Sequence, residues 1–471
     1  YVKKRYISEQ NLNNFKLFLV TSDWSSIFID VDKVCCFDKF MQIFNSGFEI
    51  CFPVRTNVKS KANVNKRSGL EWYTEELRLF KRYLVNLHSY IQWALRYDES
   101  NIEKYKFIFK MEKRKYKNML LQAKRNFNVQ FINKASNKCR AAWQIINKVR
   151  GSQIGSNDHN LNPNSMNSYF IDSVKVMCNA VGSCNNLAST LLGNTINLDS
   201  VFGWKMVSNE DILKIVNQFR NSKSKDIYDN NIRIVKYVIY DIIDLVTHCI
   251  NQSLSSGIFP QSFKLAKVVP IFKKGDPTLQ ENYRPVSILP IFSKIMEKVM
   301  YNQLIDFFET SNIFNNNQFG FRRGRSAIDA VHNLVNHVIN GFEIHDNTLT
   351  LLCDLSKAFD CVSHDLIISK LSHYGVSGNE LKLIKSFLTN RFQTTFLEGN
   401  FSEILKIEFG VPQGSVLGPL LFLIMINDLP VNVSCRSLLF ADDTTLFASM
   451  RCINELKSYM HNSFAEASKW F

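Results

Sequence analysis

The sequence lacks the features that mark secreted, membrane-spanning or zinc-binding proteins. No apolar run approaches the ~20 residues of a membrane-spanning helix, and the N-terminus has no signal-peptide pattern. The eleven cysteines form no Cys-x-x-Cys pair and no metal-like grouping with the nine histidines, so no zinc site is predicted. We expect reduced thiols in an intracellular protein, several of them buried, among them Cys249 and Cys353.

Acidic residues are scarce relative to basic ones. The 57 Lys and Arg outnumber the 42 Asp and Glu, and the resulting net charge of +15 suits a polyanionic partner such as a nucleic acid. Residues 101–150 alone hold 14 of the basic residues, interspersed with aromatic side chains. This pattern indicates a nucleic-acid-binding helical region, although a basic helix face is also often merely solvated. The contacts are expected from Lys113, Arg114, Lys117, Lys124 and Arg125.

Two strand-like apolar runs end in carboxylates. The run Leu349–Leu355 contains Asp354, and Asp442 and Asp443 fall in the tight turn expected between two short strands. If these strands are neighbours in one sheet, three carboxylates converge, which is unfavourable unless divalent cations neutralise them. Two such cations held by carboxylate oxygens form the apparatus of phosphoryl transfer. The two short strands are expected at Ser437–Ala441 and Thr444–Ala448.

The same carboxylates also have a simpler explanation. An Asp-Asp pair in a turn often only hydrogen-bonds locally, but an Asp inside an apolar strand is harder to explain because an unpaired buried charge is costly. Between the two places lies Gly410–Pro419, whose glycines and prolines permit a sharp turn and close backbone approach to a ligand. The apolar run Leu420–Ile426 that follows predicts a helix buried against the sheet.

These segments resemble, in order, motifs A, B and C of the palm of reverse transcriptases. The motifs correspond to Asp354 with Phe359, to Pro412-Gln413-Gly414 and to Ala441-Asp442-Asp443. Their surroundings, residues 354–360 and 440–447, are most similar to non-LTR (LINE, jockey-like) retrotransposon polymerases. Two upstream segments, Asn282–Ser287 and Gln318–Ser326, match the fingers motifs of the same family. Five ordered motifs over about residues 205–471 make the resemblance specific.

The resemblance implies an α/β (α+β) fold. It would be a right-hand polymerase with fingers and a ferredoxin-like antiparallel palm sheet, preceded by the basic helical region. The family's endonuclease and thumb are expected to be absent from this chain, since residues 1–65 hold no catalytic His/Asp cluster and the sequence stops at Trp470-Phe471. The expected divisions are an N-terminal remnant or linker (1–65), the basic helical region (66–150), a linker (151–204), a helical prelude (205–264) and fingers with palm (265–471).

The resemblance further implies an RNA-directed DNA polymerase that copies element RNA from a DNA 3′ end. Asp354, Asp442 and Asp443 would be catalytic and hold two Mg²⁺ ions, with Asp443 the one that could support rather than ligate. The implied partners are an RNA template, a DNA primer or target, and deoxynucleoside triphosphates, with the basic helical region binding RNA. Cytoplasm and nucleus are the implied locations.

Motif A and motif B residues would bind the nucleotide. Phe359 falls where the family places a bulky ring against the sugar 2′ position, which would exclude ribonucleotides by clash. The alternative is a core phenylalanine, one of 37 in this chain. Gln413 would lie beside the incoming nucleotide, with Lys357 and Ala358 in the same site, whereas Asp360 is expected to cap or brace the following helix.

Negative charge on the triphosphate also requires cations from the protein. Two stretches mix basic residues with Gly or Pro, as mobile phosphate-gripping loops do, and Arg284 and Arg322 are the preferred pair. The alternative is that these are solvated loop charges. The other candidates in the two stretches are Lys273, Lys274, Arg323 and Arg325.

Elsewhere the apolar periodicity predicts helices separated by linkers. Ser208 opens a helix in capping-box style, and two N-terminal runs, Phe15–Val20 and Phe48–Pro53, are strand-like. Further helices are expected at Leu70–Tyr97, Asn101–Asn133, Ala135–Val149 and Phe170–Leu192, and linkers at Val58–Arg67 and Gly151–Asn167.

Three alternatives remain open. A group II intron maturase-type reverse transcriptase would differ in its linker and fingers signatures and would support splicing. An RNA-dependent RNA polymerase would incorporate ribonucleotides, against which Phe359 argues. A catalytically inactive remnant would only bind RNA, although no metal-site motif looks damaged.

Overall fold

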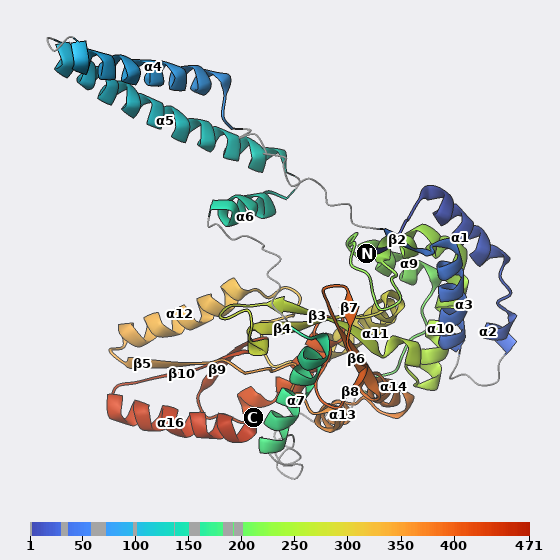
Figure 1. Cartoon of the computed structure of the whole chain (residues 1–471). Coiled ribbons are helices and arrows are strands. Elements are labelled where there is room, and N and C mark those ends of the chain that lie inside the picture. The colour runs from blue at the N-terminus through green and yellow to red at the C-terminus, as the bar shows by residue number, and fades with distance from the viewer. Residues whose placement is uncertain are drawn as a thin grey trace. The chain divides into compact units, whose positions relative to one another are not determined.

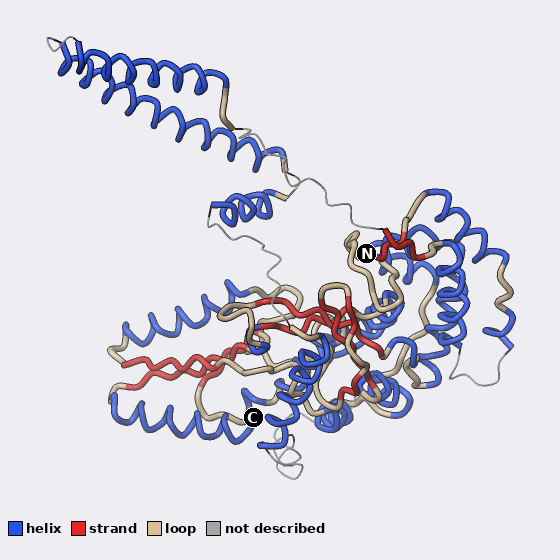
Figure 2. The backbone as a smooth tube through the Cα atoms, in the orientation of Figure 1, coloured by secondary structure: helices blue, strands red, loops and turns tan. Residues whose placement is uncertain are grey.

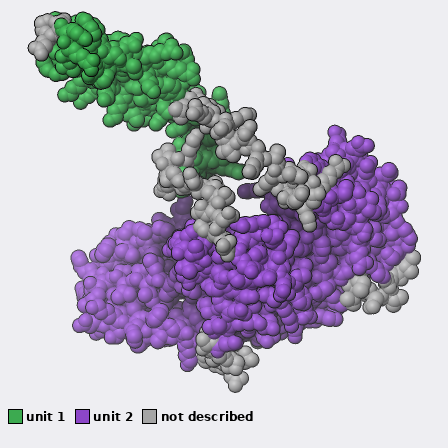
Figure 3. All heavy atoms as spheres, in the orientation of Figure 1, with its two compact units in different colours: residues 1–2, 56–158 green, residues 3–55, 159–471 purple. Residues whose placement is uncertain are grey.

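The computed structural model describes residues 2–29, 36–57, 72–97, 101–135, 137–149, 161–181, 192 and 201–471. The chain divides into two compact units (Figure 3). One comprises residues 1–2 and 56–158, and the other comprises residues 3–55 and 159–471. All five sequence motifs lie in the second, larger unit.

The aspartate-bearing strands form one three-stranded antiparallel sheet in the order β5-β10-β9 (Figures 1 and 2). Helix α12 covers one face of this sheet and α16 the other (Figure 1). Alternate residues of β10 serve the two faces: Phe447 clusters with Ala330 of α12, whereas Leu446 joins the main core with Leu456 of α16. The bounds are Asn347–Cys353 (β5), Arg436–Phe440 (β9), Asp443–Met450 (β10), Ala327–Glu343 (α12) and Ile453–Trp470 (α16).

A second sheet has mixed pairing. Its order is β4-β3-β6-β7, and β8 also pairs with β6. Strand β3 lies antiparallel to β4 and parallel to β6, so the sheet joins a local hairpin to a strand more than a hundred residues later in the chain. The bounds are Leu265–Phe272 (β3), Tyr283–Ile288 (β4), Arg391–Leu397 (β6), Asn400–Phe401 (β7) and Leu405–Ile407 (β8).

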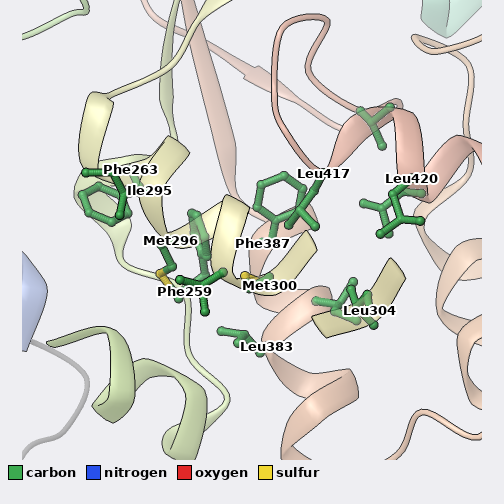
Figure 4. Close-up of a cluster of buried hydrophobic side chains, with 14 of the residues drawn as sticks. Phe259, Phe263, Ile295, Met296, Met300, Leu304, Leu383, Phe387, Leu417 and Leu420 are labelled. Carbon is green, nitrogen blue, oxygen red and sulfur yellow. The ribbon is translucent and has the colours of Figure 1, made fainter. Parts of the chain in front are cut away.

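Helices α10 and α11 run through the main core of this unit. Helix α10 is apolar around most of its circumference and is buried along its length, Cys249 included, whereas Cys353 is only partly buried. Figure 4 shows Met300 of α11, Leu383 of α14 and Leu420 of α15 among the buried side chains of this core. The bounds are Asn209–Gln218 (α9), Ile232–Ser256 (α10), Ile291–Thr310 (α11), His364–His373 (α13), Gly378–Leu388 (α14) and Gly418–Ile426 (α15).

Several short helices and strands accompany these elements. Helix α9 opens on a capping box between Ser208 and Asp211, as expected. Two short strands, β1 and β2, pair with each other. The bounds are Val2–Arg5 (β1), Val54–Asn57 (β2), Gln261–Phe263 (η2), Gln280–Asn282 (η3) and Leu429–Val431 (η4).

The strand-like runs near the N-terminus are helical, so that prediction was wrong. Phe15–Val20 lies in α1 and Phe48 lies in α3. Their phenylalanines pack edge to face with one another and with Phe292 of α11, whose ring centroid lies 5.0 Å from that of Phe44. Burial of these rings at helical spacing outweighs the local β propensity of short apolar runs. The bounds are Glu9–Thr21 (α1), Ser25–Ile29 (α2) and Cys36–Cys51 (α3).

The smaller unit is built around a helical hairpin. Helices α4 and α5 lie side by side, with the ring of Phe80 stacked on Tyr116 and the Tyr73 and Tyr116 hydroxyls 2.6 Å apart. Helix α4 buries Leu77, Leu84 and other apolar residues, whereas α5 has no fully buried residue. The three predicted helices of this region are confirmed, with bounds Glu75–Tyr97 (α4), Ile102–Lys134 (α5) and Lys138–Val149 (α6).

The expected linkers are only partly within the described residues. Val58–Arg67 and residues 151–160 lie outside them. Helix α7 spans Pro163–Val181. It therefore begins before the expected Phe170 and includes residues 163–167, which were expected to belong to the Gly151–Asn167 linker. Pro163 suits the first turn of a helix because its missing N–H would have no partner there.

The observed fold class is the mixed α/β class expected, with an antiparallel sheet at the aspartate-bearing strands. Within the described ranges, no helix is long and apolar enough to cross a membrane.

Candidate active site

The register of the first sheet brings the predicted catalytic residues to one end. Cys353 is paired with Thr444 in the terminal pair of β5 and β10, and Asp354 and Asp443 are the residues that adjoin this pair. Both therefore lie at the same end of the sheet. Asp354 follows the last residue of β5 rather than lying inside the strand. Asp442 lies in the turn as expected, whereas Asp443 is the first residue of β10 and not part of the turn, so that half of the prediction was wrong.

The three aspartates have no side-chain partner among the residues that the structure describes. None of their carboxylates accepts a hydrogen bond or joins an ion pair within the described part of the chain. Asp354 and Asp443 are exposed and Asp442 is half-buried. Unpaired carboxylates at one sheet edge have the donor chemistry that a hard divalent cation requires. However, no group of three or more His, Cys, Asp or Glu among the described residues is arranged to hold a metal ion, so the side chains as placed do not complete a metal centre.

The turn that carries Asp442 is held by a segment from a distant motif. Asn317–Gly320 runs alongside β9, with Phe319 N donating to Leu439 O (2.8 Å) and Leu439 N donating to Asn317 O (2.9 Å). Gly320 comes so close that a Cβ atom there would lie 2.2 Å from the Ala441 nitrogen, so no other residue fits without displacement. Ala441 itself has a left-handed φ of 58°, a conformation that costs a non-glycine residue of order 1 kcal/mol or more.

The arginines that follow this segment, Arg322 to Arg325, make hydrogen bonds and ion pairs within the protein. Arg322 forms a bidentate ion pair with Glu309 (2.6 and 3.0 Å) and donates to Asn315 O, and its side chain is only 8% exposed. Arg325 donates to both the carbonyl and the side chain of Asn316. Of this stretch, Arg323 has the most open guanidinium, with a 3.4 Å contact to Asp306. The structure thus places Arg322 as a brace for the loop, and its proposed contact with a nucleotide stays a prediction.

The other basic candidates are exposed. Arg284 lies on β4 opposite Ile271, and Lys273 and Lys274 follow β3 in the same hairpin. Within the described residues, none of their side chains makes a hydrogen bond or ion pair to another side chain. These three cations are therefore free to meet a ligand.

Phe359 lies between the core and the surface. Its ring contacts buried Phe422 at a centroid distance of 4.7 Å and exposed Phe321 at 6.4 Å. Lys357, nearby in the same turn, has a left-handed φ of 54° and donates to Ser173 Oγ, with its ammonium over the Tyr169 ring. Burial lowers the pKa of this lysine. Ala358 is half-buried between them.

Asp360 does not cap the following helix, so that expectation was wrong. Ser363 is the N-cap of α13, its side chain accepting from Leu366 N. The Asp360 carboxylate instead accepts a hydrogen bond from Gln413 Nε2 at 2.9 Å. Burial raises the pKa of Asp360 to about 6, although Lys357 and the Gln413 bond oppose that rise. Motif A and motif B are thus joined through side chains.

A buried glutamate holds the far end of the motif B loop. Glu297 of α11 accepts hydrogen bonds from the amides of Val416 (2.7 Å) and Leu417 (3.4 Å), just before α15 begins. Its side chain is fully buried, and burial raises its pKa. At the near end, Ser287 N donates to Gln413 O at 2.7 Å. A Cβ atom on Gly414, whose φ is 117°, would lie 2.4 Å from Ser287 O, so this turn requires glycine.

The five basic residues predicted to bind nucleic acid all lie on α5 in the smaller unit and are exposed. Two of them also lie over aromatic rings: Lys113 is 5.8 Å from the centroid of Phe109, and Lys124 is 4.7 Å from that of Trp72. The set comprises Lys113, Arg114, Lys117, Lys124 and Arg125.

Comparison with known proteins agrees with this arrangement. Residues 271–471 match the family described as "Reverse transcriptase (RNA-dependent DNA polymerase)". The chain is 34% identical, over 47% of its length and 26% of the relative, to a probable RNA-directed DNA polymerase from transposon BS of Drosophila melanogaster. It is 28% identical to the RNA-directed DNA polymerase from mobile element jockey of Drosophila melanogaster, over 53% of this chain and 28% of the relative.

Residues 271–471 are therefore a reverse transcriptase domain. The relatives to which this domain is similar are named as RNA-directed DNA polymerases from transposon BS and from mobile element jockey. The chain spans about a quarter of the length of these relatives.

Three residues that position the site were missed in the sequence. Gln318 was recognised only as part of a fingers motif, and its contact with the Ala441 amide depends on the tertiary fold. Glu297 is one of three acidic residues of α11, and its burial against the motif B loop depends on the tertiary fold. His364, whose Nε2 lies 2.7 Å from Gly410 O, had no distinguishing sequence signal.

Proposed function

We propose that this chain is the RNA-directed DNA polymerase of a non-LTR retrotransposon, extending a DNA 3′ end on an RNA template. The observation that carries the proposal is the β5-β10 register: its terminal pair is Cys353 with Thr444, Asp354 and Asp443 adjoin that pair, and neither carboxylate has a partner among the described residues. Such an element copies itself into chromosomal DNA, so the proposed site of action includes the nucleus.

In this proposal the β5-β10-β9 sheet with α12 and α16 is the palm, and the β3-β4 hairpin with Asn317–Arg325 belongs to the fingers. Leu352, on the face of β5 shared with Asp354, is 76% exposed, so this end of the sheet offers an open surface where a primer end could lie. Exposed Arg284, Lys273 and Lys274 would meet the phosphates, as cations that no acidic side chain of the described residues engages.

Asp354 and Asp442 would hold divalent metal, with Asp443 as ligand or support, and Mg²⁺ is the proposed ion. Bound metal would supply Lewis-acid activation of the primer hydroxyl and neutralise charge on the triphosphate. The protein's own contribution is positioning: Gln318 and Gly320 fix the turn that carries Asp442, and Glu297 fixes the motif B loop. Phe359 would exclude a ribonucleotide by contact with its 2′-hydroxyl.

The α4-α5 hairpin is proposed to bind RNA. The five predicted Lys and Arg residues are exposed on a helix with no fully buried residue, and two of them lie over aromatic rings that could also stack on bases. Binding of this kind is expected to depend strongly on salt.

The test measures incorporation of labelled dTTP by the 471-residue chain on poly(rA) primed with oligo(dT), in the presence of Mg²⁺. Template-dependent incorporation of dTTP in large excess over UTP is the expected result. Preferred incorporation of UTP would indicate an RNA polymerase instead. Binding of RNA without any incorporation would favour an inactive RNA-binding remnant, and support of splicing would favour the maturase-type alternative.

A further inference from the structure

A groove in the smaller unit runs between the segment that leads into α4 and one face of α5. Its volume is about 510 Å³, within the usual size of a ligand site. The lining residues on α5 run from Met119 to Gln130 at spacings of three and four, so they form one stripe along the helix. The lining includes Trp72 and Leu77 on one side, and Gln122, Asn126, Phe127 and Gln130 on the other.

Aromatic contacts fix the wall of the groove that leads into α4. The Tyr73 hydroxyl lies 2.6 Å from that of Tyr116 on α5, and it is 3.4 Å from Leu77 O. The ring of Phe80 stacks on the same Tyr116 ring, with the two ring planes 9° apart. Trp72 packs edge to face against Tyr73 at a centroid distance of 5.7 Å. The Trp72 ring is therefore held in place while remaining half-buried, so one part of it is open to a ligand.

Three carboxamides in the groove have no partner. Gln122, Asn126 and Gln130 are exposed and make no hydrogen bond within the described residues. A carboxamide has both a donor and an acceptor, so it can pair with the edge of any nucleobase. Trp72 and Phe127 add ring faces on which a base can stack. Aromatic rings beside polar groups that can pair with base edges are the means by which proteins bind unpaired RNA.

Basic residues surround this uncharged stripe. Lys115 and Lys134 lie on α5 four positions beyond either end of it, so they continue the same face of the helix. The ammonium of Lys124 lies 4.7 Å from the centroid of Trp72. From Lys113 onward α5 has basic residues and no acidic one. The groove itself contains one acidic residue, Glu76, whose carboxylate suits the amino group of a base rather than a phosphate. Phosphates are thus attracted to the rim, and bases fit the interior.

We propose that this groove holds unpaired bases of RNA, which stack on Trp72 and Phe127 and pair with the carboxamides of α5. The inference rests on the proposed binding of RNA by the α4-α5 hairpin, and it specifies single-stranded RNA as the ligand. In a duplex the base faces are stacked on one another and the pairing edges are used, so mainly phosphates and sugar hydroxyls remain for a protein to contact. The groove therefore distinguishes single strands from duplexes, which the basic residues alone do not.

The test uses fluorescence anisotropy with the 471-residue chain and three labelled RNAs of one length. These are a mixed-sequence single strand, the same strand annealed to its complement, and the same strand with abasic spacers, which keep the phosphates and lack the bases. Trp72→Ala is expected to weaken binding of the single strand about tenfold, the equivalent of one base stacked on a ring, and to leave the other two unchanged. Asn126→Ala combined with Gln130→Ala should weaken it about fivefold, for the loss of hydrogen bonds to bases.

The slope of log affinity against log salt should stay the same in these variants, since none of them removes a charge. Two exposed residues of the same unit that lie outside the groove provide matched controls: Trp143→Ala on α6 and Gln92→Ala on α4 should behave as wild type. If Trp72→Ala fails to fold, the double amide variant decides the question, because it breaks no hydrogen bond within the described residues and alanine favours the helix.

Equal weakening for the single strand, the duplex and the abasic strand would overturn the proposal, and so would no weakening in either variant. Both results would leave RNA binding through the basic residues intact. A wild-type chain that binds none of the three RNAs would refute the proposed binding of RNA by the hairpin, and this inference with it.

Discussion

Gln318 accepts a hydrogen bond from the backbone amide of Ala441, although the two residues are 123 positions apart in the chain. The same Oε1 atom accepts from Gly320 N at 2.8 Å, and the side chain is 1% exposed. Ala441 immediately precedes Asp442 and holds a left-handed φ. One buried amide thus ties a fingers motif to the turn on which the candidate metal ligands depend.

Replacing Gln318 with methionine should therefore impair the site more than the fold. The variant keeps the length of the side chain but leaves the Ala441 amide without its acceptor, at a cost of about 1–3 kcal/mol in the free energy of unfolding. We expect dTTP incorporation to fall about tenfold or more while RNA affinity is retained. Urea unfolding and primer extension measure the two effects, and Gln261→Met, on an exposed glutamine, is the control. Full activity in Gln318→Met would show that the turn at Asp442 keeps its conformation without the hydrogen bond from Ala441 to Gln318.

Asp354→Asn should abolish incorporation without destabilising the protein. Because the Asp354 carboxylate has no partner within the described residues, the substitution breaks no internal bond, and the free energy of unfolding should stay within about 0.5 kcal/mol of wild type. Loss of a metal-ligating charge should lower incorporation at least about a hundredfold and weaken Mn²⁺ binding in calorimetry. Asp346→Asn, at the opposite end of β5, is the control. Unaltered Mn²⁺ binding would remove Asp354 from the metal site.

The sequence motifs predicted where the candidate site lies, but they did not predict which residues contact the motif residues. The turn at Asp442, the helix after motif B and the three helices of the basic region follow from local patterns, and the structure has all of them. The partners of the motif residues do not follow from such patterns. Arg322 is engaged by Glu309 and Asp360 by Gln413, and both pairings depend on how distant segments pack.

The N-terminal helices show why short windows mislead. Phe37, Phe40, Phe44 and Phe48 recur at helical spacing, which is visible only over more than ten residues. A six-residue window around Phe48 contains too little of that period and gives a strand-like pattern. Burial against Phe292 then decides the outcome.

Phe359→Val should admit ribonucleotides. The shorter side chain leaves room for a 2′-hydroxyl, so we expect the ratio of UTP to dTTP incorporation to rise at least about tenfold if the ring acts by clash. Because the ring also contacts Phe422, the protein should lose about 1–2 kcal/mol of stability. Phe401→Val, on a half-exposed ring of β7, controls for loss of a phenylalanine. Destabilisation with unchanged sugar selection would assign Phe359 to the core alone.

Neutralising the basic face of α5 should weaken RNA binding and its salt dependence together. Each phosphate contact with a single strand contributes about 0.7 to the slope of log affinity against log salt, so changing all five predicted residues to glutamine should reduce the magnitude of that slope by about 3.5. Fluorescence anisotropy with a labelled RNA at several salt concentrations measures both quantities. As a single-site comparison, Lys117→Gln should have a larger effect than Lys382→Gln, which lies on α14 in the other unit. If both substitutions weaken RNA binding equally, RNA affinity depends only on the total charge of the protein and not on the position of these residues.

The buried carboxylate of Asp360 should make stability depend on pH. Its pKa is raised from 3.8 to about 6 by burial, so the folded protein holds a proton that the unfolded chain has lost between these values. Folding stability at this residue therefore falls as the pH rises from about 4 to 6, by up to about 3 kcal/mol in all, and the loss persists above pH 6. Asp360→Asn has no charge to bury and keeps an acceptor for Gln413. Its stability relative to wild type should therefore grow across this window, as measured by urea unfolding at pH 5 and pH 7.5. A difference that does not change with pH would mean that Asp360 ionises as easily in the folded chain as in the unfolded one.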